Sequence, residues 1–179
     1  AVSAFGVVAL ATWNVADPSF SHATANPVTN AAGYPGAVFS DIAMQFFGLG
    51  AFFALIPAVV WGIMLSSGVM PTHMGRRGSA WFGGLLLLSA VVGCMRVPST
   101  WPLPSGLGGI AGDMVLKFPA VATGGYPAGW LAVLLALLLT VPATGLMLFA
   151  CNFRRRESRS SSQLARGQIS QDDLDEDAE

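Results

Sequence analysis

Charged side chains are scarce in this sequence. Only 11% of its 179 residues are Asp, Glu, Lys or Arg, and Lys117 is its single lysine. Because about a quarter of the residues in a soluble domain are charged, this composition excludes an ordinary water-soluble domain. Apolar residues take their place: 53% of the chain is hydrophobic and the mean hydropathy is +0.59. The sequence therefore predicts a membrane protein.

The residue types that build most catalytic and cofactor sites are also few. Cysteine and histidine occur twice each, and neither cysteine belongs to a CxxC motif. His22 and His73 both fall between the apolar runs, which leaves no histidine inside the membrane to hold haem or chlorophyll. The glycine-rich SGLGGIAGD lacks the lysine and hydroxyl of a phosphate-binding P-loop. We predict no catalytic residue, no metal site and no bound cofactor.

Long apolar runs predict an all-α polytopic membrane protein with four transmembrane helices. We expect the spans at residues 1–13, 41–66, 80–96 and 128–150. About 20 apolar residues are needed to cross a bilayer, so the first run is interpreted as an incomplete span. Ser40 is expected to be the N-cap of the second span, with Asp41 in its first turn. Pro57 and Pro142 are expected to kink the second and fourth spans.

Small residues within the runs predict close helix packing rather than transport. Gly48, Gly50 and Gly62 offer flat patches, and Ser89 and Gly93 have the small-xxx-small spacing of packed membrane helices. Proton relays and ion pathways place ionisable residues at mid-depth in a membrane. The runs carry none there, so the sequence does not support a transporter.

Positive charge predicts the orientation of the spans. The arginines that set topology, and that are placed to contact anionic lipid, are Arg76, Arg77, Arg154, Arg155, Arg156 and Arg159. Since cytoplasmic flanks are enriched in Lys and Arg, both chain ends are expected in the cytoplasm, and residues 14–40 and 97–127 are expected to be periplasmic loops. Residues 151–179, basic and then acidic, are expected to form a disordered linker or tail. Cys94 and Cys151 would then lie at opposite membrane faces, too far apart for a disulfide.

The second loop contains a pattern with two interpretations. GIAGDMVLKF, residues 109–118, would place Ile110, Met114 and Phe118 on one face of a helix and its charged residues on the other. That pattern is typical of a short helix lying in the membrane interface. An irregular loop with incidental spacing is the alternative.

Parts of the sequence recur. The matching residues are Gly36, Asp41 and Phe46 against Gly108, Asp113 and Phe118, and Gly33-Tyr34-Pro35 against Gly125-Tyr126-Pro127. A duplicated unit of span, loop, turn and span would produce such matches. Chance in low-complexity sequence is the other interpretation.

Two loop motifs resemble a known family. The stretch WNVADPSFSHATANPVTNAAGYPGAVFSDIAMQFFG, residues 13–48, resembles the first periplasmic loop and second span of the amino-terminal membrane domain of FtsK/SpoIIIE-type bacterial DNA translocases, especially those of alphaproteobacteria. WPLPSGLGGIAGD, residues 101–113, resembles the second periplasmic loop of that domain. The residues that carry the resemblance are Trp13, Asn14, Asp17, Pro18, Asn30, Gly33, Gly36, Asp41, Trp101, Pro102, Pro104, Gly106, Gly108, Gly109 and Asp113.

This resemblance implies a four-span anchor in the bacterial inner membrane that targets a translocase to the division septum. Its partners would be membrane lipids and other membrane proteins, either division proteins or copies of itself, without direct nucleic-acid binding by this stretch. The ATPase motor would lie outside these residues, so the stretch itself would have no enzymatic activity. The alternative is an accessory subunit of a larger photosynthetic or respiratory complex that keeps the anchor fold without the motor. Whether the chain is part of a longer protein stays open at this point.

Overall fold

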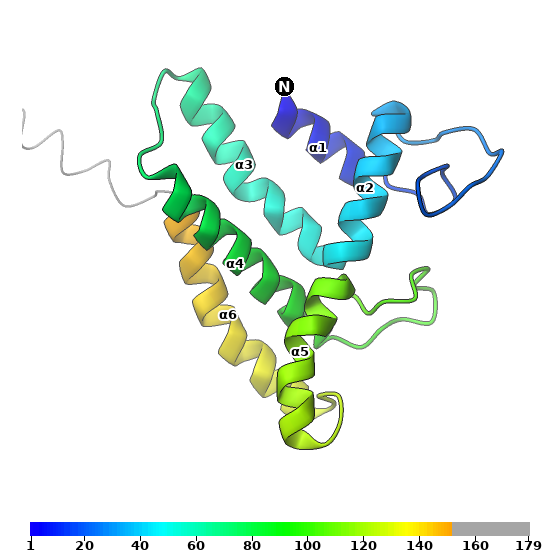
Figure 1. Ribbon diagram of the computed structural model, residues 1–179, viewed down its shortest axis with the longest axis vertical. Coiled ribbons are helices and arrows are strands. Elements are labelled where there is room, and N and C mark those ends of the chain that lie inside the picture. The colour runs from blue at the N-terminus through cyan, green and yellow to red at the C-terminus, as the bar shows by residue number, and fades with distance from the viewer. Residues whose placement is uncertain (152–179) are drawn as a thin grey trace, which may run out of the picture.

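The apolar runs fold as helices, because a helix satisfies every backbone hydrogen bond within its own segment. A computed structural model describes residues 1–151, in which every regular element is helical, as expected for an all-α chain. The elements are α1 (Val2–Ala11), α2 (Gly33–Phe47), the 3-10 turn η1 (Gly48–Gly50), α3 (Ala51–Ser66), α4 (Met74–Gly93), α5 (Gly109–Thr123) and α6 (Trp130–Cys151) (Figure 1). Residues 152–179, which include Arg154, Arg155, Arg156, Arg159 and the predicted tail, lie outside the described residues.

Helices α3, α4 and α6 run side by side, with α4 in contact with both neighbours (Figure 1). Leu85 and Leu88 of α4 pack against Ala143 and Met147 of α6. Two indole groups tie the three helices together. The Nε1 of Trp61 donates to the carbonyl of Ala150 at 2.9 Å, and the Nε1 of Trp81 donates to the carbonyl of Ala54 at 3.1 Å.

Two helical stretches are long and apolar enough to cross a membrane by length and composition. They are Gly33–Ser66, which combines α2, η1 and α3, and Trp130–Cys151. Helix α1 is a shorter apolar helix of 10 residues. The four-span arrangement therefore remains a prediction.

The predicted N-cap of the second span is wrong. Helix α2 begins at Gly33, its N-cap is Ala32 without a side-chain cap hydrogen bond, and Ser40 and Asp41 lie buried within the helix. Helix α2 can begin this early because residue 33 is a glycine. Its φ of 70° lies in the left-handed region, which favours glycine. The interruption in this stretch is at η1, where Gly48 has a φ of 55°. Pro57 lies inside α3 without ending it.

Arg76 and Arg77 lie in the first turn of α4 rather than in the preceding loop. Helix α4 begins at Met74, six residues before the expected start of the third span at residue 80. The Arg77 side chain is buried, and its Nη1 has no hydrogen-bond partner among residues 1–151.

Helix α5 confirms that the second loop contains a helix and excludes the irregular alternative. Its inner face is Ala111, Gly112 and Leu116, which are buried. Its outer face carries the expected apolar stripe, Ile110, Met114 and Phe118, with exposed fractions that rise from 45% to 80%. Whether this stripe lies in a membrane interface stays a prediction.

The order of elements supports a duplicated unit only in part. Helix, long loop and 15-residue helix occur twice, as α1 followed by α2 and as α4 followed by α5. The GYP matches are not equivalent, because Gly33-Tyr34-Pro35 begins α2 whereas Gly125-Tyr126-Pro127 lies between α5 and α6.

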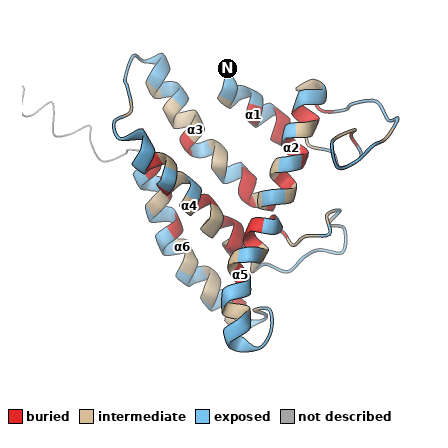
Figure 2. Cartoon of the chain, in the orientation of Figure 1, coloured by how far each residue is buried: buried red, intermediate tan, exposed pale blue. Residues whose placement is uncertain are grey.

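Both long loops project from the same side of the molecule (Figure 1). The start of α1, the connection between α3 and α4 and the end of α6 lie toward the other side (Figure 1). Buried residues gather where α2, the end of α4 and the start of α5 meet (Figure 2). The fold therefore brings the two loop motifs together next to its core.

Candidate functional site

The first loop is folded around the carboxylate of Asp17. Its Oδ1 accepts hydrogen bonds from the backbone N of Thr29 at 2.9 Å and from the Thr29 Oγ1 at 2.7 Å, and its Oδ2 accepts from the backbone N of Asn30 at 2.9 Å. Asn14 closes the same loop, since its Nδ2 donates to the Thr29 Oγ1 at 3.0 Å. We call Asp17, Thr29 and Asn30 the loop knot.

These hydrogen bonds stabilise the ionised form of Asp17. Burial by itself would raise the pKa of this carboxyl, but the side chain of Thr29 and the backbone N–H groups of Thr29 and Asn30 outweigh that effect and hold its pKa below the ordinary value. Asp17 is therefore an anion at neutral pH, and the loop knot is a charge-assisted network.

Asn30 joins the loop knot to the helices on either side of it. Its Nδ2 donates to the carbonyls of Ala9 at 2.8 Å and Thr12 at 3.2 Å, at the end of α1. Its Oδ1 accepts from the backbone N of Ala32, just before α2. A Cβ at Gly36 would lie 2.4 Å from that Oδ1, so only glycine fits there.

The second loop meets the first through two tryptophans. The rings of Trp13 and Trp101 lie 6.4 Å apart, and the Nε1 of Trp101 donates to the carbonyl of Ser105 at 3.0 Å. Both rings pack against the buried cluster of Leu10, Met44 and Ala51. Each loop is thus anchored on the same apolar cluster.

Below the loops, η1 crosses the start of α5 at backbone distance. The backbone N of Leu49 donates to the carbonyl of Leu107 at 2.9 Å. A Cβ at Gly48 would lie 2.0 Å from that carbonyl oxygen, and one at Gly109 would lie 2.5 Å from the Gly48 N. Since Cβ atoms have no room here, glycine is the residue that permits the contact.

Helix α4 contributes Ser89 to the same place. A Cβ at Gly108 or Gly112 would lie 2.1 Å or 2.6 Å from the Ser89 carbonyl oxygen, and one at Gly50 would lie 2.3 Å from its Oγ. We call the residues of this contact the glycine crossing: Gly48, Gly50, Ser89, Gly108, Gly109 and Gly112. It fixes the position of the second loop relative to α2 and α4.

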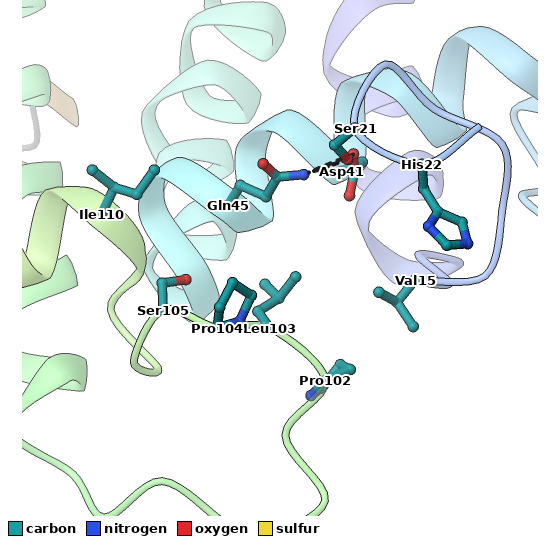
Figure 3. Close-up of a pocket in the computed structure, with 10 residues that line it drawn as sticks. All are labelled: Val15, Ser21, His22, Asp41, Gln45, Pro102, Leu103, Pro104, Ser105 and Ile110. Carbon is teal, nitrogen blue, oxygen red and sulfur yellow. Dashed lines mark hydrogen bonds between the residues drawn. The ribbon is translucent and has the colours of Figure 1, made fainter.

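A pocket of about 300 Å³ opens between the two loops (Figure 3). Asp41 and Gln45 of α2 form one side, and Leu103 and Pro104 of the second loop face them. The complete lining is Val15, Ser21, His22, Asp41, Gln45, Pro102, Leu103, Pro104, Ser105 and Ile110. The pocket therefore exists only while both loops hold their places.

Other predicted residues lie outside the pocket. Pro18 is half-buried in the first loop, next to Asp17. Asp113 is half-buried on α5, where a Cβ at Gly106 would lie 3.2 Å from its Oδ1. The hydroxyl of Tyr126 donates to the carbonyl of Asp113 at 3.1 Å, and burial together with the Asp113 charge raises the pKa of Tyr126.

The residues that sequence reasoning missed are the polar partners within the site. Thr29 of the loop knot, and Ser21 and Gln45 of the pocket, lie outside the residues singled out from the motifs. Thr29 directly precedes the motif residue Asn30, whereas Ser21 and Gln45 are not next to any of the motif residues. Only the folded loop shows what these three residues contact. Gly48, Gly50 and Ser89 were expected to pack closely, and the structure supplies their partners.

The arrangement is suited to recognition. Residues 1–151 contain no group of three His, Cys, Asp or Glu side chains that could hold a metal ion. The site offers an ordered polar loop, an aromatic pair and a small pocket. These are the components of a contact surface.

Comparison with known proteins identifies the family. Residues 1–155 match the family described as the 4TM region of DNA translocase FtsK/SpoIIIE. The chain is 62% identical over 146 residues to the DNA translocase FtsK of Mesorhizobium japonicum. The aligned region covers 82% of this chain and 16% of that protein. It is 49% identical over 181 residues to the FtsK of Brucella suis, which covers 99% of this chain and 21% of that protein.

A third relative is the FtsK of Rhizobium meliloti, 52% identical over 147 residues, with 82% of this chain and 17% of that protein covered. No solved structure matches the chain. The chain thus spans about a fifth or less of the length of these relatives. On the extent of the family match and on these identities, the chain belongs to the family of the 4TM region of DNA translocase FtsK/SpoIIIE.

Proposed function

We propose that this chain is the membrane anchor and septal-targeting domain of a cell-division DNA translocase. It works through helix–helix and protein–protein contacts. Helices α1, α3, α4 and α6 are the four spans. Helices α2 and α5 accompany the loops on the periplasmic side, and α5 lies in the membrane interface.

The observation that carries this proposal is the outward apolar surface of α6. Leu137, Leu138 and Val141 expose 62%, 69% and 74% of their surface, and the helix has 22 residues without a charged side chain. In water such a surface would drive association, whereas lipid tails solvate it. The α3 part of the apolar stretch Gly33–Ser66 supports the same interpretation.

The arginines and the fold together support the proposed orientation. Arg76 and Arg77 lie in the first turn of α4, which begins at the side opposite the two loops. Arg154 follows the end of α6 in sequence. The positive-inside rule then places this side, with both ends of the chain, in the cytoplasm of the inner membrane. Both loops face the periplasm, where septal partners are reached.

The relatives support a division of labour along the chain. They are named DNA translocases, and their matched regions are only 16–21% of their length. We infer that the ATPase motor lies in the remainder of such a protein and that this region performs no chemistry. The comparisons do not favour an accessory subunit of a photosynthetic or respiratory complex.

Cysteine labelling tests the topology. Starting from a variant with Cys94 and Cys151 replaced by alanine, single cysteines are placed at Ala25, Thr100 and Thr72, which are exposed. In spheroplasts, a membrane-impermeant maleimide is expected to label positions 25 and 100, and to label position 72 only after lysis. Labelling of position 72 in intact spheroplasts would contradict the proposed orientation.

Septal targeting requires a separate measurement. A fluorescent fusion of the full-length translocase is expected at the division site, and a matched fusion that lacks residues 1–151 is expected to be dispersed. Equal septal recruitment of both fusions would refute targeting by this region while leaving its role as an anchor intact.

A further inference from the structure

Asp41 is a buried carboxylate whose hydrogen-bond partners are all neutral. Only 6% of its surface is exposed. Its Oδ2 accepts hydrogen bonds from the Ser21 hydroxyl and, at 2.9 Å, from the Gln45 Nε2. Gln45 is fixed in turn, because its Nε2 also donates to the Ser21 Oγ at 2.6 Å. One carboxylate oxygen is thus held rigidly by two uncharged groups.

The other oxygen of Asp41 is directed toward the pocket. Among residues 1–151 no hydrogen bond reaches its Oδ1, and Figure 3 shows the side chain at the pocket wall opposite Leu103 and Pro104. This oxygen is not among the buried atoms without a partner, so it borders the open space of the pocket. A carboxylate oxygen that faces the pocket in this way attracts a positively charged occupant.

The remaining walls suit an aliphatic stem. Val15, Leu103 and Ile110 supply apolar surface, and Pro102 and Pro104 add ring carbons. A volume of about 300 Å³ is at the lower end of small-molecule sites and about ten times the volume of one water molecule. One long side chain fits this space, with its charged end at Asp41 and its methylene groups against the apolar wall.

We propose that the pocket binds a lysine or arginine side chain presented by a partner protein, with Asp41 as the counter-ion. That this partner is periplasmic rests on the proposed function, whereas the chemistry of the pocket does not. A lysine or arginine carries its charge on a neutral stem of three or four methylene groups, which the walls accommodate. The amine of a phosphoethanolamine headgroup lies close to a phosphate, which Asp41 would repel.

Binding is measured with small probes on the whole 179-residue chain in lipid nanodiscs. Ile110 lines the pocket, and its δ1 methyl group serves as the reporter in ¹³C-methyl NMR, with Ile56 and Ile63 of α3 as internal references. The probes are N-acetyl-arginine amide, N-acetyl-lysine amide, the neutral isostere N-acetyl-citrulline amide, and phosphoethanolamine. We expect the two basic amides to shift Ile110 and citrulline to bind at least about tenfold more weakly.

Matched variants locate the effect. Asp41→Asn keeps an acceptor for Ser21 and Gln45 and is expected to weaken binding of the arginine probe at least about tenfold. Asp113→Asn removes a half-buried carboxylate outside the pocket and is expected to leave binding unchanged. Val15→Trp fills the pocket and leaves the Asp41 side chain unchanged, and it is expected to abolish binding.

The same titrations can overturn the proposal. Equal binding of citrulline would show that charge is not recognised, and equal binding of phosphoethanolamine would assign the site to lipid. An unmoved Ile110, or binding unaffected in both Asp41→Asn and Val15→Trp, would refute the pocket. If Asp41→Asn shifts the reference signals of Ile56 and Ile63, the substitution has disturbed the fold. The binding measured with Val15→Trp then decides whether the pocket is the binding site. Cysteine labelling tests the membrane topology independently of these titrations. The proposed orientation and the proposed binding pocket can therefore each fail without the other.

Discussion

Gly112→Ala tests the glycine crossing against a matched control. Gly112 lies on α5, and an added Cβ would stand 2.6 Å from the Ser89 carbonyl oxygen and 3.0 Å from the Ser89 carbonyl carbon. Carbon atoms pack favourably at about 3.5–4.0 Å, so α5 would have to retreat from α4 by about 1 Å. Gly145 lies on α6 with nothing within 4 Å of the equivalent Cβ position.

The magnitude follows from two opposing terms. Alanine is favoured over glycine within a helix by about 0.8–1.0 kcal/mol, and this term applies to both variants. Overpacking against a backbone costs about 1–3 kcal/mol and applies only to Gly112→Ala. We therefore expect Gly145→Ala to be neutral or stabilising, and Gly112→Ala to be less stable than Gly145→Ala by about 1–3 kcal/mol.

Tryptophan fluorescence during heating in nanodiscs measures this difference. At about 2–4 °C per kcal/mol for a chain of this size, the midpoint of Gly112→Ala should lie several degrees below that of Gly145→Ala. Both variants are heated at one rate, because an irreversible transition depends on the scan rate. Equal midpoints, or a higher midpoint for Gly112→Ala, would refute the close backbone approach of α5 to α4.

Three further predictions concern the loop knot and the helix contacts. The pKa of Asp17 is lowered in the folded state, so this carboxylate stabilises the fold above its unfolded-state pKa of about 4, and the stabilisation is lost as the pH falls through the folded pKa. Asp17→Asn should therefore lower the thermal midpoint at pH 7. The difference in thermal midpoint between Asp17→Asn and wild type should vanish on acidification. Gly36→Ala should speed proteolysis of the first loop, whereas Gly125→Ala, with open space around its Cβ position, should not. Trp61→Phe and Trp81→Phe should each cost about 0.5–1.5 kcal/mol through a lost hydrogen bond, and a double-mutant cycle should show coupling because the rings meet edge to face at 5.8 Å.

The sequence was sufficient to predict the helical class and the family. Long uncharged runs predict helices that are apolar enough to cross a membrane. Hydropathy did not predict where the second of these helices begins. The sequence predicts a start at Ser40, but α2 begins at Gly33, because its start depends on Asn30 and on the backbone conformation of a glycine.

Long-range contacts explain most of the features of the structure that the sequence did not predict. Gly48 interrupts its helix because the carbonyl of Leu107 approaches it at backbone distance, and that carbonyl lies 59 positions later in the sequence. The pocket likewise needs Val15 and Pro104 from two different loops. The sequence predicts that Arg77 lies in a loop. Because α4 begins earlier than predicted, Arg77 instead lies in its first turn, where it is buried.

The loop knot has a consequence for the speed and strength of recognition. A 21-residue connection, residues 12–32 between α1 and α2, would ordinarily sample many conformations, and a partner would have to select one of them. Asp17 and Asn30 remove that freedom during folding, before any partner arrives. Association then meets a rigid template, so that little chain entropy is lost in the encounter. A weak contact of small area can be specific for this reason.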